Sequence, residues 1–282
     1  MRLDAHQHFW RYDKAQHVWM TDAMAALRRD YLPEDLAPLL QQTRLEGTIA
    51  VQARQMVEET EWLLALAERH TFIRGVVGWV DLRSPDVGAQ IERLGANPRL
   101  VGVRHVVHDE PDDDFMLRPE FRRGIALLGP AGLTYDLLLR PPHLKAAIRL
   151  VDEFKDQRFV LDHIAKPQFG DISGSIWKED ILRLAERPNV FCKLSGLVTE
   201  ADWNAWRPHD FRPALDVVLE AFGADRLMMG SDWPVCTLAA DYATTMGVVM
   251  DFVRDLKASE RDGILGGNCA RFYGVALEKE GA

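Results

Sequence analysis

Short apolar runs alternate with longer amphipathic stretches along the whole chain. The runs are rich in Val, Ile and Leu, and turn-forming or polar residues bound most of them. Continuous apolar runs of this length are typical of parallel strands that are buried on both faces. The pattern predicts strands at residues 2–9, 47–53, 73–82, 100–107, 133–140, 159–166, 189–196 and 226–233.

The stretches between these runs show helical periodicity. Residues 58–70 and 209–223 repeat apolar side chains every three or four positions, as the buried face of a helix does. In the second of these helices we expect Asp210 to be the N-cap and Gly223 to lie just past the C-terminal end.

Eight repeats of strand and helix, with no break in composition, predict a (β/α)8 TIM barrel, an α/β fold, formed by residues 1–282 as a single domain. Residues 108–115 and 199–213 follow strands and are expected to be long loops. They would lie at the C-terminal ends of the strands, which is where barrel enzymes bind their substrates.

Composition narrows the class of partner. The net charge of −9 comes from 34 basic and 43 acidic residues, which argues against binding to nucleic acid or to an anionic membrane surface. No apolar run approaches the length of a membrane span, and no signal peptide is visible. Three cysteines are too few for a disulfide framework, so we expect a cytoplasmic protein. For its oligomeric state, which no sequence feature indicates, we expect a monomer or a homodimer.

Polar residues occupy late positions in the predicted strands, where a barrel places its chemistry. Because side chains alternate along a strand, His6 and His8 point the same way and Gln7 points the other way. The late-strand polar and aromatic residues are His6, His8, Gln52, Trp79, Asp81, Arg104, His105, Asp136, Asp162, His163, Lys166, Lys193, Ser195, Ser231 and Asp232.

Four of these residues are candidate catalytic groups: His6, His8, His163 and Asp232. A His-x-His pair alone is most often a packing or hydrogen-bonding feature. Burying four such groups at one barrel mouth costs several kcal/mol unless they are paired or bind something. The set therefore favours a functional site over a structural one.

Three motifs give a resemblance to a known family. DAHQHFW, LDHIAKP and MGSDWPV, in the first, sixth and eighth predicted strands, resemble signatures of the amidohydrolase superfamily, in its amidohydrolase-2 branch. Within that branch they are similar to the cluster of L-fuconolactonase-like and L-rhamnonolactonase-like sugar lactonases. The resemblance runs from Asp4 to about Tyr273. It implies hydrolysis of a sugar (aldonic acid) lactone, with L-fucono-lactone first, in carbohydrate catabolism such as L-fucose degradation.

The sequence departs from the metal-dependent pattern of that superfamily. Asp136 stands where such members carry a histidine at the end of the fifth strand, and Arg104 replaces a bridging lysine. An arginine has no lone pair to give to a metal. We therefore expect that no cofactor is required. A single zinc or manganese ion, where present, would be held by His6, His8 and Asp232, with His163 or a water as a further ligand.

For the reaction, we expect Asp232 to be the general base that takes a proton from water. His6, His8 and His163 would donate hydrogen bonds to the developing oxyanion, and at least one of them would be protonated near neutral pH.

Further residues are expected to contact the substrate. Arg104 either positions the sugar ring or pairs with Asp81 or Asp136 inside the barrel, and both roles stay open. Trp203 and Trp206 are candidates for a lid, because indole faces commonly stack on sugars. The expected substrate-binding residues are Arg104, Trp79, Asp136, Lys166, Trp10 and Gln52.

Two alternatives remain at this stage. The first is a metal-dependent amidohydrolase-2 hydrolase or decarboxylase that acts on another small carboxylate or lactone. The second is a non-catalytic ligand-binding barrel, although a binding protein has no need of a general base.

Overall fold

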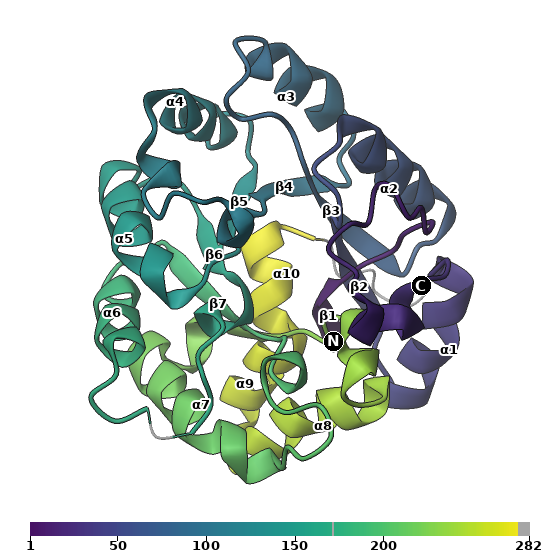
Figure 1. The fold of residues 1–282 in the computed structure, drawn as a ribbon, viewed down its shortest axis with the longest axis vertical. Coiled ribbons are helices and arrows are strands. Elements are labelled where there is room, and N and C mark those ends of the chain that lie inside the picture. Colours follow the sequence, from purple (N-terminus) through teal and green to yellow (C-terminus); the bar gives the residue numbers. More distant parts are fainter. Residues whose placement is uncertain (171, 276–282) are drawn as a thin grey trace.

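Eight parallel strands form the centre of the molecule (Figure 1), as a computed structural model shows for residues 1–170 and 172–275. Each strand pairs with the next one along the chain, from the first to the eighth. The predicted (β/α)8 barrel is therefore confirmed. The strands are β1 (Leu3–Gln7), β2 (Gly47–Val51), β3 (Ile73–Gly78), β4 (Leu100–His105), β5 (Thr134–Leu137), β6 (Phe159–Leu161), β7 (Val190–Leu194) and β8 (Leu227–Met229).

The barrel closes where the segment after β8 meets the end of β1. The backbone N–H of Asp232 donates to the carbonyl oxygen of His6 at 2.8 Å, and the N–H of His8 donates to that of Trp233 at 2.7 Å. These two hydrogen bonds tie residues of the candidate site to one another through the backbone alone.

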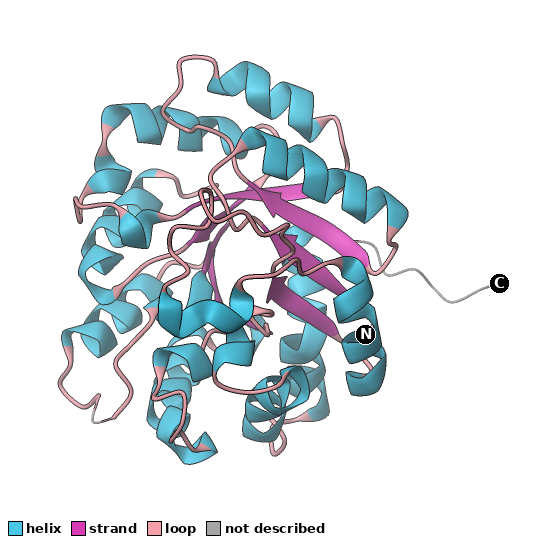
Figure 2. Cartoon of the chain, turned by 45° about the vertical axis from the view of Figure 1, so that its right-hand side comes forward, coloured by secondary structure: helices cyan, strands magenta, loops and turns pink. Residues whose placement is uncertain are grey.

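The main helices form a ring around the strands (Figure 2). Amphipathic sequence explains this layer, because the eight longer helices each bury apolar residues on one side and expose polar residues on the other. The helices are α1 (Pro33–Thr43), α2 (Val57–Arg69), α3 (Val87–Gly95), α4 (Pro119–Leu128), α5 (Leu144–Glu153), α6 (Ile176–Ala185), α7 (Pro208–Phe222), α8 (Tyr242–Phe252), α9 (Ala258–Asp262) and α10 (Asn268–Tyr273).

Two local expectations are wrong at the start of α7. Arg207 is the N-cap, and Asp210 instead accepts a hydrogen bond from the Arg207 backbone N–H at 2.7 Å, as the third residue of the helix. Pro208 at the first helical position explains the early start, because its fixed φ suits a helix and its missing N–H costs nothing there. The loop expected at 199–213 therefore ends at Arg207.

The core has two parts, one between the strands and the helices and one inside the barrel. The inner part packs Leu3, Ile49 and Met228 against Phe272 and Tyr273 of α10. Figure 1 shows α10 inside the ring of outer helices. Side chains of α10 thus fill the barrel beneath the polar site. No helix within residues 1–170 and 172–275 combines the length and the apolar character that a bilayer crossing requires.

Candidate active site

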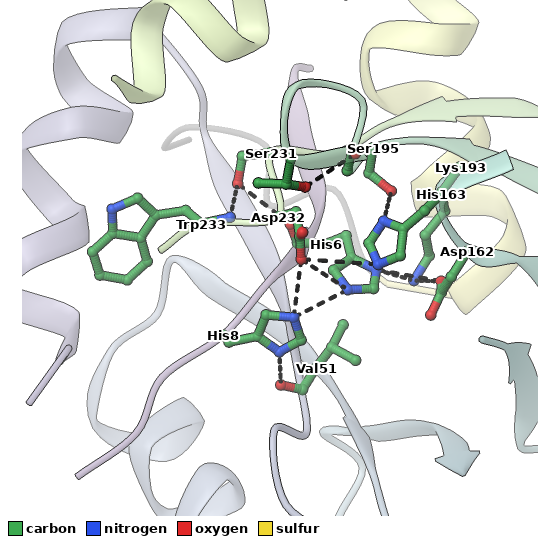
Figure 3. Close-up of polar contacts among 12 residues, drawn as sticks. His6, His8, Val51, Asp162, His163, Lys193, Ser195, Ser231, Asp232 and Trp233 are labelled. Carbon is green, nitrogen blue, oxygen red and sulfur yellow. Dashed lines mark hydrogen bonds and ion pairs between the residues drawn. The ribbon is translucent and has the colours of Figure 1, made fainter. Parts of the chain in front are cut away.

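The first and last strands bring two imidazoles and a carboxylate together (Figure 3). His6 lies in β1 and His8 follows the last residue of that strand. Their Nε2 atoms are 3.2 Å apart. Asp232, beyond β8, places Oδ1 3.2 Å from His8 Nε2 and 3.8 Å from His6 Nε2. The side chains of His6 and His8 therefore point the same way, as strand alternation predicts.

His163 joins this group from the end of β6. Its Nε2 lies 3.9 Å from Asp232 Oδ1, and its Nδ1 lies 2.9 Å from Ser195 Oγ. The predicted strand stops at Leu161, and the backbone has a positive φ from His163 through Lys166. This turn aims the imidazole into the barrel mouth. All four candidate catalytic residues therefore meet around one carboxylate oxygen.

Gly196 permits the close approach of His163. A Cβ at position 196 would lie 2.6 Å from His163 Nδ1, and the φ of +65° is in the region that glycine adopts most readily. Gly196 follows Ser195, the hydrogen-bond partner of the same nitrogen. Backbone shape and side-chain contact at the end of β7 thus fix His163 together.

Asp4 secures the position of Asp232, and sequence reasoning missed it. One Asp4 oxygen accepts the backbone N–H groups of Ser231 at 2.9 Å and His6 at 3.0 Å. The other accepts the hydroxyls of Ser231 at 2.6 Å and Tyr242 at 3.0 Å. Burial raises the pKa of Asp4 to about 6, although these hydrogen bonds oppose the rise. The side chain joins β1, the β8 end and α8 at one point.

The hydrogen-bond partners assign the tautomers of the two β1 histidines. His8 Nδ1 lies 2.8 Å from the carbonyl oxygen of Val51, which can only accept, so Nδ1 carries the proton. Arg104 Nη1 donates to His6 Nε2 at 3.2 Å, so His6 also carries its proton on Nδ1, 3.3 Å from Asp162 Oδ1. With its proton on Nδ1, His6 presents the lone pair of Nε2 toward His8. His8 Nε2 lies 3.2 Å from both His6 Nε2 and Asp232 Oδ1, so a second proton on His8, at Nε2, is donated to the carboxylate.

This donor set fits a metal ion. His6, His8 and Asp232 each offer one ligand atom, and these atoms lie within 4.8 Å of one another. The outer Nδ1–H groups are held by a carbonyl and by a carboxylate, as is usual for metal-binding histidines. Imidazole nitrogens with one carboxylate suit a single zinc or manganese ion. Against this, Arg104 also contacts the lone pair of His6 Nε2.

A buried ionic network lies beneath the histidines. Lys193 Nζ is 2.5 Å from Asp136 Oδ2 and 3.0 Å from Asp162 Oδ1, and all three side chains are fully buried. The hydroxyl of Tyr273 donates to Asp136 Oδ2 at 2.8 Å. Lys193 Nζ also lies 3.2 Å from His6 Nδ1. Two carboxylates thus share one ammonium group directly under the β1 histidines.

Asp162 and Lys193 are among the late-strand polar residues of the sequence, but the sequence pattern assigns neither of them a role in the site. A lysine inside the apolar run VFCKLSG was the available signal, because lysine is almost never fully buried unless it is paired. Burial alone would raise the pKa of Asp162, but Lys193 and His6 outweigh it and hold that pKa well below its usual range. Burial raises the pKa of Asp136 to about 6 despite the charge of Lys193.

Arg104 pairs with neither of the carboxylates expected for it. Its Nη1 donates to Asp162 Oδ2 at 3.1 Å. Asp136 is the register partner of Arg104 on the neighbouring strand, but its carboxylate is bound to Lys193 and Tyr273 instead. Gln52 Oε1 accepts from Arg104 Nε at 3.1 Å and from Nη2 at 2.8 Å. Gln52 and Asp162 therefore orient the guanidinium at the bottom of the cavity.

Burial sets the protonation of the histidines. Burial lowers the pKa of His6 and of His163 well below the ordinary range, and the neighbouring carboxylates only partly oppose this. For Asp232 burial alone would raise the pKa, but His163 and a hydrogen bond with His8 outweigh it and lower the pKa. Asp232 is thus ionised at neutral pH. The expectation of a protonated imidazole is wrong for His6 and His163.

A cavity of about 370 Å³ opens above these groups. Lys166 lies in its wall and forms an ion pair with Glu200 at 2.6 Å. Arg104 and Lys166 are the two expected substrate-binding residues that reach this cavity. Its lining residues are His8, Trp19, Met24, Ala53, Arg104, Val106, His108, Asp109, Leu138, Arg140, His163, Lys166, Thr199, Glu200, Trp203, Asp232, Val235 and Leu238.

The other four expected substrate-binding residues lie outside the cavity lining. Gln52 and Asp136 serve as the buried partners already described. Trp10 is completely buried and donates from Nε1 to the carbonyl oxygen of Arg29 at 2.9 Å. Trp79 directs Nε1 to His105 Nδ1 at 3.3 Å. Trp10 is part of the core, and Trp79 is half-buried and bonded to His105. Neither lines the cavity, which corrects the expectation that they contact the substrate there.

The two lid candidates separate. Trp203 lines the cavity, and its Nε1 donates to the carbonyl oxygen of Thr199 at 2.9 Å. Trp206 donates to the carbonyl oxygen of Ala239 at 3.1 Å and lines a different hollow on the surface. Only Trp203 of this pair is placed to cover a ligand above Asp232.

A closed (β/α)8 barrel with His-x-His at the end of β1 and an aspartate after β8 defines a barrel of the amidohydrolase class. The family model described as amidohydrolase matches residues 3–275, and the chain belongs to that family. The match spans every strand and the candidate site, so family membership rests on the whole fold and not on an isolated motif.

Two curated relatives are named L-fucono-1,5-lactonase. The protein from Burkholderia multivorans is 41% identical and the alignment covers 98% of this chain and 96% of the relative. The one from Burkholderia ambifaria is 37% identical, covering 97% and 96%. Among solved structures, an amidohydrolase from Burkholderia multivorans with bound zinc is 40% identical, with a TM-score of 0.93 and coverage of 98% and 100%.

Proposed function

We propose that this protein hydrolyses a sugar lactone to the open-chain acid, with L-fucono-1,5-lactone as the first candidate substrate. The observation that carries the proposal is the meeting of His6, His8, His163 and Asp232 at the bottom of a sugar-sized cavity. Full-length relatives at 41% and 37% identity that are named L-fucono-1,5-lactonase support the choice of substrate.

Asp232 is the general base of this proposal. Its pKa is lowered, so it is a carboxylate at neutral pH and can accept a proton from water. The water oxygen then bonds to the lactone carbonyl carbon. Breaking the bond between that carbon and the ring oxygen releases an alkoxide, which takes a proton back from the Asp232 carboxyl group. One water is consumed, and a hydroxy acid is formed.

Arg104 and His163 are the donors placed to stabilise the oxyanion. Arg104 is positively charged and lines the cavity. His163 Nδ1 accepts from Ser195 Oγ in the tautomer that leaves a proton on Nε2, 3.9 Å from Asp232. Hydrogen bonds aimed at the developing charge are worth most in a buried site. His8 Nε2 is directed at Asp232, and His6 is fully buried outside the cavity lining, so neither is placed to donate to the oxyanion.

A divalent metal ion, when bound, would be held by His6, His8 and Asp232 and would polarise the carbonyl group and acidify a water molecule. The zinc in the 40% identical relative supports this possibility. The contacts that position these ligands are the same with and without a metal ion. Asp162 and the Val51 carbonyl orient the imidazoles, and Arg104 remains a fixed positive charge beside them.

The substitution Asp232→Asn tests the base. We expect kcat for the lactone to fall by about 10²- to 10⁴-fold, the usual contribution of a positioned general base. The exposed Asp255→Asn is the matched control, because it removes a carboxylate remote from the cavity. Circular dichroism would verify that both variants fold. Near-normal turnover in Asp232→Asn would contradict the proposed role.

A panel of sugar lactones, followed with a pH indicator, tests the substrate. We expect L-fucono-1,5-lactone to give the highest kcat/KM, after subtraction of spontaneous hydrolysis. Running the panel with chelator, and again after adding back zinc or manganese, separates metal-assisted turnover from turnover by the protein alone. If no lactone were hydrolysed faster than by buffer in any of these conditions, the proposed function would be wrong.

A further inference from the structure

Arg140 brings a positive charge into the cavity wall without a counter-ion. It lies three residues past β5, and no hydrogen-bond or ion-pair partner for its guanidinium occurs among residues 1–170 and 172–275. Its backbone is well held, because the carbonyl oxygen accepts the His143 N–H at 3.0 Å and two prolines follow. The side chain thus projects from a fixed base with its donors available.

His108 lies in the same wall with an unused polar atom. Its Nδ1 is buried and, within the described part of the chain, has no hydrogen-bond partner. Its Nε2 is 3.4 Å from Asp109 Oδ1. Burial, followed by the charges of Lys166, Arg140 and Arg104, lowers the pKa of His108 to about 2. The neutral imidazole therefore offers a lone pair, which can accept a hydroxyl proton from a ligand.

The other two cations of the cavity are already paired. Lys166 is held by Glu200 at 2.6 Å, and Arg104 is held by Asp162 at 3.1 Å. Asp232, the carboxylate at the cavity bottom, is surrounded by imidazoles. Among the described residues of the cavity wall, Arg140 is thus the one arginine or lysine without an ion-pair partner, so its charge is available to a ligand.

We propose that Arg140 and His108 form a subsite for the carboxylate of a polyhydroxy acid, with Arg140 binding the acid group and His108 accepting an adjacent hydroxyl. The inference rests on the proposed function, because opening a lactone creates such a carboxylate where the substrate had none. The carboxylate has two conceivable sources, the newly formed product or a second acid group on the substrate. Arginine suits both, since its planar guanidinium group can donate two parallel hydrogen bonds to a carboxylate.

Equilibrium binding provides the first test. L-fuconate, the acid formed from L-fucono-1,5-lactone, is titrated into the protein at pH 7 by calorimetry, with L-fucitol as the uncharged counterpart. We expect wild type to bind L-fuconate more tightly than L-fucitol. Arg140→Gln should weaken L-fuconate binding about tenfold, equal to about 1.4 kcal/mol, and leave L-fucitol binding unchanged.

Two variants sharpen the comparison. Arg140→Lys keeps the positive charge but lacks the planar guanidinium group with its paired N–H donors. It should bind L-fuconate more tightly than Arg140→Gln and more weakly than wild type. Lys145→Gln removes an exposed charge from α5, outside the cavity lining, and should bind L-fuconate as wild type does. Equal L-fuconate affinity in wild type and Arg140→Gln, or no preference of wild type for L-fuconate over L-fucitol, would overturn the proposal.

Kinetics separate the two sources of the carboxylate. A higher inhibition constant for L-fuconate in Arg140→Gln, with unchanged KM for the neutral lactone, assigns the subsite to the product. A higher KM confined to glucarolactone, which carries its own carboxylate, assigns it to the substrate. If the protein hydrolysed no lactone, the proposed function would fail, whereas calorimetry with sugar acids would still decide on the subsite.

Discussion

Lys193→Met removes the positive charge that two buried carboxylates share. Asp136 lies 2.5 Å and Asp162 3.0 Å from Lys193 Nζ, and none of the three side chains is exposed. Removing one partner of a buried ion pair leaves uncompensated charge, which costs about 3–5 kcal/mol. Methionine retains most of the lysine volume, so the change tests charge more than packing.

The expected loss can be expressed as a melting temperature. Unfolding entropy is about 2.1 cal/mol/K per residue, so the 282-residue chain has an unfolding entropy of about 0.6 kcal/mol/K. A loss of 3–5 kcal/mol then lowers Tm by about 5–8 °C. Urea unfolding and thermal melting monitored by circular dichroism would measure both quantities. The exposed Lys145→Met is the control, with an expected change within about 0.5 kcal/mol.

The pH dependence distinguishes a charge effect from a packing effect. Without Lys193, burial raises the pKa of Asp136 further above the unfolded value, and Asp162 loses the largest of the charges that hold its pKa low. A carboxyl group with a raised pKa in the folded state contributes stability below its unfolded pKa and loses it as pH rises through the folded pKa. The deficit of Lys193→Met should therefore be larger at pH 8 than at pH 5. A deficit below 1 kcal/mol, or one independent of pH, would refute this reasoning.

Two further substitutions probe the supports of the site. Gly196→Ala places a Cβ 2.6 Å from His163 Nδ1, so kcat/KM should fall at least about tenfold. Gly132→Ala is the control, because it shares the positive φ but has nothing within 4 Å of its Cβ; it should show the cost of backbone strain alone, without loss of activity. Asp4 has a pKa of about 6 when folded, against 3.8, so its stability contribution is present below pH 3.8 and disappears through pH 6. In urea titrations, the stability advantage of wild type over Asp4→Asn should narrow by about 1.4 kcal/mol from pH 5 to pH 8; a constant difference would contradict the raised pKa.

The sequence pattern was sufficient for the barrel and for its central polar residues. Apolar runs located all eight strands, because burial on both faces leaves a strong signal. Strand alternation placed His6 and His8 on one side, and the position of Asp232 late in its strand brought it to the same mouth.

The sequence pattern could not predict which side chains on other strands these residues contact. Period two indicates which way a side chain points, but not its height in the barrel relative to other strands. Arg104 therefore could not be matched to Asp162, which lies two strands away. Trp10 misled for a related reason, because a tryptophan near a strand end packs in a core as readily as it lines a cavity.

The hydrogen bond between Tyr273 and Asp136 has a consequence for folding during synthesis of the chain. The network beneath the histidines joins residue 136 to residue 273, and the site above it joins His8 to Asp232. Contacts so distant along the chain cannot form while the later segment is still being synthesised. The site and its supporting network can therefore be completed only after α10 has emerged from the ribosome.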